Sequence, residues 1–133
     1  MDAHESLPWQ PVSPGFSLKV LRGGVDDDTR VLLLRVEPGT VVPLHRHFGE
    51  VHGFNLAGSR KILETGEVVG PGGYVYEPPG NLDSWMAVGD EPLVALVTVR
   101  GAMETLGPSG EVVSRSTTSS VTRAYQDFLQ QRR

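Results

Sequence analysis

The stretch that decides the fold runs Gly39-Thr40-Val41-Val42-Pro43-Leu44-His45-Arg46-His47. Residues 41–47 are predicted to form a β-strand, and side chains two positions apart on a strand point to the same face. His45 and His47 therefore share one face, while Arg46 points to the other. Two imidazoles on one face can hold one metal ion. Neighbouring histidines on a strand are also common as ordinary surface residues, so the sequence around them has to decide.

Short apolar runs separated by glycine and proline continue on both sides of this stretch. The chain contains 16 glycines and 10 prolines in 133 residues, which is typical of many short strands joined by tight turns. The predicted strands cover residues 16–21, 31–36, 41–47, 51–56, 60–65, 67–69, 74–77, 93–100 and 110–114. Nothing in the chain alternates strands with helices, so we predict an all-β jelly-roll barrel and not a doubly wound α/β fold.

The length favours one domain with three parts. Residues 1–14 contain three prolines and are predicted to form an extended arm, residues 15–115 the barrel, and residues 116–133 a tail with a short helix. Ser119 and Ser120 can cap this helix. One apolar stripe then follows at helical spacing, formed by Val121, Tyr125, Phe128 and Leu129. This stripe is predicted to pack on the barrel.

The composition excludes several classes of site and partner. The absence of cysteine rules out disulfides, thiolate catalysis and cysteine-based metal sites. A net charge of −4 argues against nucleic acid or an anionic membrane surface as the main partner. No stretch has the pattern of a signal peptide or a membrane span, so we expect a cytoplasmic protein. The acidic triplet at residues 26–28 lacks the spacing of a calcium loop and is interpreted as a solvated turn.

A second motif reinforces the first. It consists of a glycine, a proline, a second glycine and a candidate ligand, at Gly72-x5-Pro78-x-Gly80-x2-Asp83. Together with the opening stretch, this spacing resembles the two motifs of the cupin superfamily, over residues 16–100. The resemblance implies a single-domain cupin jelly-roll barrel. It does not fix a reaction, because cupins include several classes of enzyme and inert binding modules.

The chain departs from the cupin pattern at three positions. His52 stands where the family has a glutamate, Asp83 where it has a third histidine, and Ala87 where it has an asparagine. A carboxylate from Asp83 would complete a set of two histidines and one carboxylate, which suits non-haem Fe(II). Asp83 could equally cap the turn after Pro-Pro-Gly, so both interpretations stay open.

Two further residues are candidates from strand alternation. His52 alternates with Phe54 and Leu56, which are plausible interior residues, so His52 is predicted to point inward as a ligand or as a catalytic acid or base. Glu64 shares a face with Arg60 and could return to the level of the histidines. The alternative for Glu64 is a solvated carboxylate at a sheet edge.

A closer resemblance rests on three segments. They are His45-Arg-His-Phe-Gly-Glu-Val-His-Gly-Phe54, then Gly58 followed by Glu64, then Gly73-Tyr-Val-Tyr-Glu-Pro-Pro-Gly80. These segments resemble the 2,4′-dihydroxyacetophenone dioxygenase group of cupins and, more distantly, acetylacetone-cleaving dioxygenases. The resemblance implies a non-haem Fe(II) enzyme that uses O₂ to cleave a carbon–carbon bond beside a carbonyl. It also implies a ligand set of His45, His47, Glu64 and Asp83, in which Asp83 replaces a histidine.

The predicted function is therefore oxidation of a small aryl ketone or diketone by a cupin dioxygenase with one divalent metal. Fe(II) is the first choice, with Zn²⁺, Mn²⁺ or Ni²⁺ as alternatives. Four aromatic residues are predicted to line either the substrate pocket or the core, namely Phe54, Tyr74, Tyr76 and Trp85. A homodimer is expected from the arm, from sheet edges that need cover and from the resemblance. Two alternatives remain: a redox-neutral cyclase or isomerase with His52 as base, and a non-catalytic ligand-binding cupin.

Overall fold

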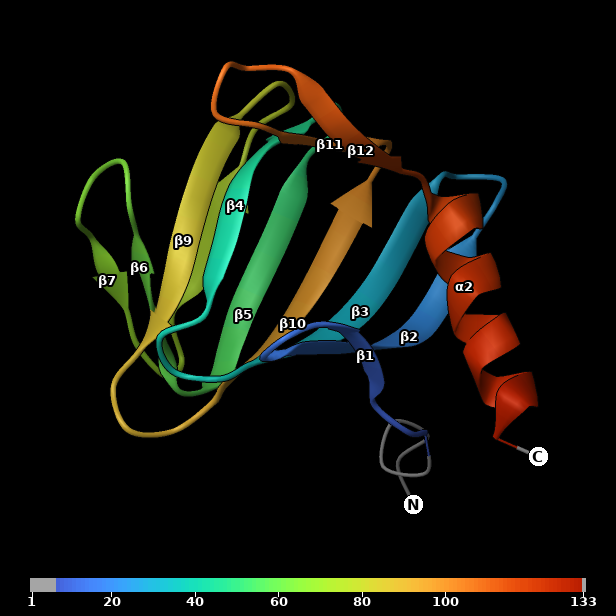
Figure 1. The fold of residues 1–133 in the computed structure, drawn as a ribbon, viewed down its shortest axis with the longest axis horizontal. Helices are drawn as coiled ribbons and strands as arrows, with labels where there is room; N and C mark the ends of the chain where they lie inside the picture. Colours follow the sequence, from blue (N-terminus) through green and yellow to red (C-terminus); the bar gives the residue numbers. More distant parts are fainter. Residues whose placement is uncertain (1–6, 133) are drawn as a thin grey trace.

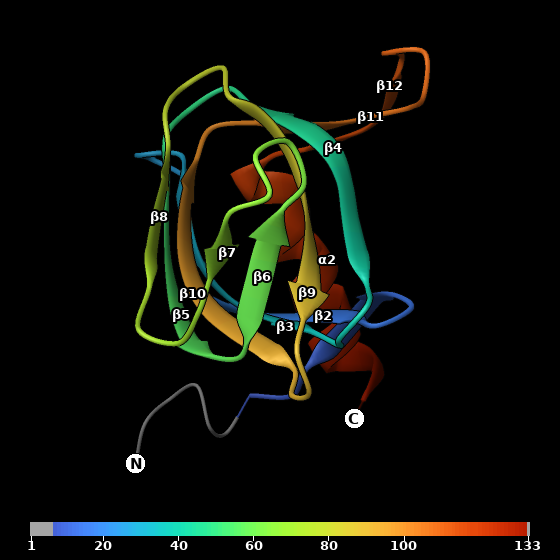
Figure 2. The same cartoon turned by 90° about the vertical axis from the view of Figure 1, so that its left-hand side faces the viewer.

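Two antiparallel sheets curve towards each other and enclose the interior of the protein, as Figures 1 and 2 show. The structure is a computed structural model that describes residues 7–132. The first sheet contains, in spatial order, β1 (Gln10–Ser13), β2 (Phe16–Gly24), β3 (Thr29–Val36), β10 (Leu93–Arg100), β5 (Val51–Ala57) and β8 (Tyr74–Glu77). The second contains β12 (Val112–Ser116), β11 (Met103–Leu106), β4 (Val41–His47), β9 (Leu82–Val88), β6 (Ser59–Ile62) and β7 (Val68–Val69). The predicted all-β class is confirmed.

The strands predicted from apolar runs are confirmed, and three further strands were missed. β4, β8 and β10 have the predicted bounds. The missed strands are β1, which falls in the predicted extended arm, and β9 and β11. On β9 the buried positions are Asp83, Trp85 and Ala87. An acid and an alanine at two of three inward positions hide the alternation by which a half-buried strand is recognised.

The space between the sheets is filled by side chains from both layers. The core contains Leu34, Val36, Trp85, Leu93 and Val97, all at most 9% exposed. β3 and β10 run side by side in full register, with Leu93 opposite Val36 and Arg100 opposite Thr29. This pairing forms the centre of the first sheet, where the longest run of β-branched residues is buried.

The C-terminal helix α2 (Thr118–Gln131) lies against β2 and β3 (Figure 1). Its predicted apolar stripe is confirmed, since Tyr125 is buried and the other three stripe residues pack on the core. The helix begins earlier than predicted: Thr117 is the N-cap, because Thr117 and Ser120 exchange side-chain and backbone hydrogen bonds. Among residues 7–132, no helix is long and apolar enough to cross a membrane.

The predicted arm is tied to the body wherever it is described. Its first six residues lie outside the described part of the chain. Gln10–Ser13 pair with β2 as strand β1, and the Tyr125 hydroxyl donates a hydrogen bond to the Pro8 carbonyl at 2.7 Å. The N-terminal segment and the terminal helix therefore hold each other in place.

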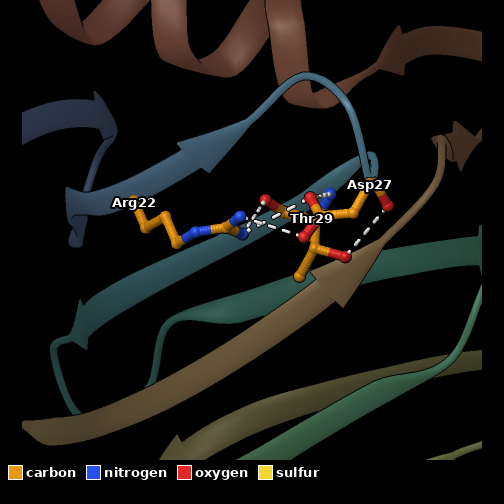
Figure 3. A network of polar contacts seen from close by, with 3 residues as sticks. All are labelled: Arg22, Asp27 and Thr29. Carbon is orange, nitrogen blue, oxygen red and sulfur yellow. Dashed lines mark hydrogen bonds and ion pairs between the residues drawn. The ribbon is translucent and has the colours of Figure 1, made fainter.

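The acidic turn between β2 and β3 is held by an arginine (Figure 3). Arg22 Nη2 lies 2.9 Å from Asp27 Oδ2, and the Thr29 backbone amide donates to Asp27 Oδ1 at 3.2 Å. Both side chains of the ion pair are about half exposed. The interpretation of this triplet as a surface turn agrees with these contacts.

Candidate metal centre

Two buried histidines on β4 point into the space between the sheets. His45 is 3% exposed and His47 is 4% exposed, and their ring centroids lie 4.8 Å apart in an edge-to-face arrangement. The exposed fractions along β4 alternate towards its end, so that Arg46 between them is directed away. The predicted shared face of the two histidines is therefore present.

A glutamate from the opposite sheet completes a candidate ligand set. Glu77 ends β8 and is 4% exposed. One ligand atom from each of His45, His47 and Glu77 lies within 4.8 Å of the others. The Asn81 side-chain amide donates to Glu77 Oε1 at 3.2 Å and fixes the carboxylate. Glu77 is the register partner of Val51 on β5. The carboxylate therefore comes from the strand beside β5, which carries His52 at the position of the usual cupin glutamate.

Asp83 of β9 lies beside this group and contacts one of its members. It is the register partner of His45, and its Oδ1 lies 2.9 Å from His45 Nε2. The turn between Glu77 and Asp83 crosses from one sheet to the other. Gly80 N donates to the His47 carbonyl at 2.6 Å, and His47 N donates to the Asn81 carbonyl at 3.1 Å. The crossing turn is thus bonded to the histidine strand itself.

The hydrogen-bonding pattern of His45 fits a metal ligand. Its Nδ1 lies 2.8 Å from the Pro43 carbonyl oxygen, which can only accept, so Nδ1 carries the hydrogen. In the neutral ring Nε2 then has a free lone pair, and it faces another acceptor, the buried Asp83 Oδ1. Either a proton or a metal ion has to lie between His45 Nε2 and Asp83 Oδ1. A histidine whose far nitrogen donates to a carbonyl is the usual arrangement around a bound metal.

His47 offers a second nitrogen without a competing partner. Its buried Nδ1 has no hydrogen-bond partner among the described residues, and its Nε2 lies 3.7 Å from Glu77 Oε1. Burial, followed by the neighbouring His45 charge, lowers the pKa of His47 to about 4. The ring is therefore neutral at neutral pH, as a metal ligand must be.

The pKa values of the two carboxyl groups at the site, Glu77 and Asp83, shift in opposite directions. Burial, together with the Asp83 charge, raises the pKa of Glu77 to about 7. Burial is the largest influence on Asp83 and opposes its ionisation, but the hydrogen bond and charge of His45, together with contributions from Glu77 and His47, outweigh burial and lower the Asp83 pKa. Burial likewise disfavours protonated His45, yet Asp83 and the Pro43 carbonyl outweigh it and raise the His45 pKa. Both pKa shifts favour a proton on His45 and an ionised Asp83.

The predicted inward orientation of His52 is wrong. The inward positions of β5 are Val51, Gly53 and Asn55, whereas Phe54 is 45% exposed. His52 lies on the outer face, where its Nδ1 is 2.6 Å from the Tyr74 hydroxyl. The alternation was misread because the apolar residues of this strand point outward, while a glycine and an asparagine point inward.

The four aromatic candidates for the substrate pocket divide in the same way. Trp85 is 3% exposed and lines the internal cavity. Phe54, Tyr74 and Tyr76 are 45–50% exposed on the outer surface. The rings of Tyr74 and Tyr76 contact His52, and the Phe54 ring contacts Tyr74. The structure therefore brings only Trp85 of these four to the cavity.

Glu64 is not brought to the histidines. β6 ends at Ile62, where the Gly66 amide bonds to the Ile62 carbonyl and closes a turn. Glu64 in that turn is exposed and accepts hydrogen bonds from the Ser84 amide, at 2.9 Å, and the Ser84 hydroxyl. The alternation used for the prediction stops before it reaches Glu64, and Glu77 joins the histidines instead.

The candidate ligands line a cavity of about 220 Å³ between the sheets. Its walls are largely apolar, with Leu34, Val75 and Val97 among them, and two arginines, Arg30 and Arg60, also reach it. Neither Glu77 nor Arg60 was identified from the sequence as a site residue. The available signal was a charge at an inward strand position: Glu77 alternates with Val75 on β8, directly before the Pro-Pro-Gly turn.

With this geometry in view, the family assignment follows from a sequence match over residues 2–103 to the model of the ChrR Cupin-like domain. The chain belongs to this family. The cupin superfamily predicted from the two motifs is thereby confirmed. No functionally curated protein matches the chain.

Solved structures of several cupins are similar to this ChrR-like cupin. An RmlC-like cupin protein from Ralstonia eutropha JMP134 is 20% identical, with 97% of this chain and 85% of that chain covered and a TM-score of 0.89. An acetylacetone dioxygenase from Acinetobacter johnsonii is 16% identical, with 90% and 85% covered and a TM-score of 0.81. The complex of Rhodobacter sphaeroides SigE with the anti-sigma ChrR gives 22% identity, 71% and 49% coverage and a TM-score of 0.62. At these identities the likeness establishes the cupin fold alone.

Proposed function

We propose that this ChrR-like cupin is a metal-dependent enzyme, a non-haem Fe(II) dioxygenase that cleaves a carbon–carbon bond next to a carbonyl in a small ketone. The observation that carries the proposal is the buried group of His45, His47 and Glu77 at the wall of an apolar cavity. Two histidines and one carboxylate are the donor set that non-haem Fe(II) oxygenases use. The similarity to an acetylacetone dioxygenase supports the same reaction class.

The proposed roles of the residues follow from their contacts. His45, His47 and Glu77 would hold the ion, and bound Fe(II) would supply the activation of O₂ that ketone cleavage requires. Asp83 is proposed as a further carboxylate at the site, either exchanging the His45 proton or joining the ligands when that proton leaves. Its Oδ1 lies 2.9 Å from His45 Nε2, so the two atoms would face the same ion. The cavity walls exclude bulk water from the substrate.

The test is O₂ consumption by protein purified without air and loaded with Fe(II). We expect one iron per chain and O₂ uptake that matches the loss of a small ketone, tried with acetylacetone and 2,4′-dihydroxyacetophenone. The His45→Ala, His47→Ala double variant should lose both the iron and the O₂ uptake. Turnover of a ketone at the same rate without O₂ would replace the proposal by a redox-neutral lyase or isomerase.

A second function is favoured by the family match. The family description names ChrR, an anti-sigma protein that was solved in complex with SigE. A metal-binding domain without turnover is therefore the competing proposal. It predicts stoichiometric metal, no O₂ uptake with any ketone, and a change in protein association when metal is removed. Elemental analysis combined with O₂ measurement separates the two proposals.

A further inference from the structure

Arg60 is a buried cation at the wall of the same cavity. It lies on β6, opposite Ala87 of β9, and is 3% exposed. Burial lowers the pKa of Arg60, yet a guanidinium stays protonated in proteins. A buried charge is costly unless it is paired and hydrogen-bonded. Its partner therefore has to be identified.

No described residue supplies that partner. The buried Arg60 Nε has no hydrogen-bond acceptor within residues 7–132, and no carboxylate there lies within ion-pair distance of the guanidinium. Glu77 and Asp83 act on Arg60 only through space, as nearby charges. Arg30, the other arginine of the cavity, differs, since its Nη1 donates to the Gly101 carbonyl and the Thr118 hydroxyl.

The surroundings of Arg60 hold its guanidinium in one place. The group stacks over the Trp85 ring at 4.8 Å, which favours a cation on the ring face. Gly53 occupies an inward position of β5, and a Cβ there would lie 2.8 Å from Arg60 Nη2. A glycine is thus needed at residue 53 for the guanidinium to lie where it does. The side chain is positioned by packing, although no described residue accepts a hydrogen bond from its Nε.

The charges of the cavity indicate what completes the site. Arg30 and Arg60 balance Glu77 and Asp83, so the four fixed charges cancel when both acids are ionised. A divalent ion then leaves two uncompensated positive charges in a low-dielectric space. An anionic ligand with one donor for the ion and a carboxylate for Arg60 would neutralise one of these two charges.

The size of the cavity limits the ligand. About 220 Å³ is below the roughly 300–1,000 Å³ of pockets that hold drug-sized ligands. The remaining walls are apolar, so the ligand has few polar atoms beyond its two anchoring groups.

We propose that Arg60 is a specificity-determining residue that binds the carboxylate of a small 2-oxo acid, whose adjacent carbonyl faces the metal. This proposal rests on the proposed function only in placing a metal in the same cavity. Arginine suits the role because its planar donors match a carboxylate in pairs.

The test compares two ligands of nearly equal size that differ in charge. Pyruvate and 2,3-butanedione share a methyl ketone, and a carboxylate in one replaces an acetyl group in the other. Calorimetric titration of the Zn²⁺-loaded protein measures binding without turnover. We expect pyruvate to bind at least tenfold more tightly than butanedione, because a charged hydrogen bond contributes about 1.5–3 kcal/mol.

Two variants separate the anion contact from general damage. Arg60→Met keeps most of the side-chain length and removes its charge. It should weaken the binding of pyruvate about 10- to 100-fold and change the binding of butanedione less than about threefold. Gly53→Ala keeps the charge but displaces the guanidinium. It should also weaken the binding of pyruvate, while the zinc content stays unchanged. Gly70→Ala is the matched control, since a Cβ there meets only Ser59 Oγ at 3.7 Å.

Equal affinities of the wild type for the two ligands would overturn the proposal. The proposal would also fail if Arg60→Met lost affinity equally for both ligands. If Arg60→Met does not fold, the same result in Gly53→Ala would decide against it. If the protein prefers the carboxylate ligand but the Fe(II) form takes up no O₂, the dioxygenase proposal fails and the role of Arg60 stands. If the protein takes up O₂ with neutral ketones and shows no preference for pyruvate, the role of Arg60 fails and the dioxygenase proposal stands.

Discussion

At the scale of single residues, two carboxyls compete for the role of metal ligand. Glu77 lies with both histidines, whereas Asp83 pairs with only one of the two, His45. Glu77→Gln should therefore weaken Zn²⁺ or Fe(II) binding by roughly 100-fold, and Asp83→Asn by about tenfold, as for groups that support a ligand. Competition with a metal-sensitive dye measures both constants. A larger loss in Asp83→Asn would make Asp83, at the position of the third cupin histidine, the primary carboxylate.

Glu77 also gives the metal-free protein a pH-dependent stability. Its pKa is raised from 4.5 to about 7, so between these values the folded state keeps a proton that the unfolded state has released. The free energy of unfolding then falls as pH rises through this window. Relative to wild type, Glu77→Gln should gain on the order of 2 kcal/mol between pH 4.5 and 7.5. Denaturant unfolding with a chelator present measures the difference.

The other shifted groups do not remove this effect. His47, with its pKa lowered to about 4, loses stability as pH falls below its ordinary value of 6.5, in the wild type and in the variant alike. The difference between the two proteins therefore reports Glu77 together with its influence on the neighbouring His45 and Asp83. A difference that stays constant with pH would show that the buried carboxyl has an ordinary pKa.

At the scale of elements, the start of α2 depends on one reciprocal pair of hydrogen bonds. Thr117 accepts from the Ser120 amide at 3.1 Å, and the Ser120 hydroxyl accepts from the Thr117 amide at 2.9 Å. Thr117→Ala should cost about 1 kcal/mol of unfolding free energy, which lowers Tm by roughly 3–5 °C. Ser119→Ala is the control, because Ser119 lies exposed in the same turn. Equal melting temperatures for the two variants would contradict the cap.

The strands show which parts of the site were predictable from sequence. His45 and His47 were found because alternation on β4 and two motif spacings agree. His52 failed because the inward side of β5 carries Gly53 and Asn55, the reverse of the usual apolar pattern. Gly53 makes room for Arg60, and Asn55 donates to the Val69 carbonyl at 2.8 Å. Both are tertiary needs that local periodicity does not contain.

Glu77 was missed for a related reason. It joins the histidines across the gap between two sheets, and no spacing along one strand encodes a contact of that kind. Glu64 was predicted as a ligand for the opposite reason. It matched a motif spacing, but it lies beyond the end of β6. Spacing predicts contacts only while the strand lasts.

At the scale of the whole molecule, metal binding should stabilise the fold, because the ligands come from both sheets. A metal at 100 times its dissociation constant adds about 2.7 kcal/mol, or roughly 10 °C in Tm. Differential scanning fluorimetry with and without Zn²⁺ measures the shift. The His45→Ala, His47→Ala double variant should show none. A shift of the same size in that variant would place the metal elsewhere.

The homodimer expected from the sequence stays a prediction. Sedimentation equilibrium of the full chain measures the mass directly, and a mass of one chain at all concentrations would contradict it. Residues Phe54, Tyr74 and Tyr76 form an exposed aromatic group on β5 and β8. A charged substitution at Phe54 shows whether this group takes part in any association.

The turn that crosses between the sheets has a consequence for how this protein can change over evolutionary time. Glu77 and Asp83 lie on either side of it, and its backbone is bonded to His47. One residue inserted or deleted there would move a carboxyl out of the site or turn it to the opposite face. The surface loops can vary in length, but this turn cannot without loss of the site. Relatives that keep the same chemistry should therefore share the distance between the two acids more strictly than they share overall sequence.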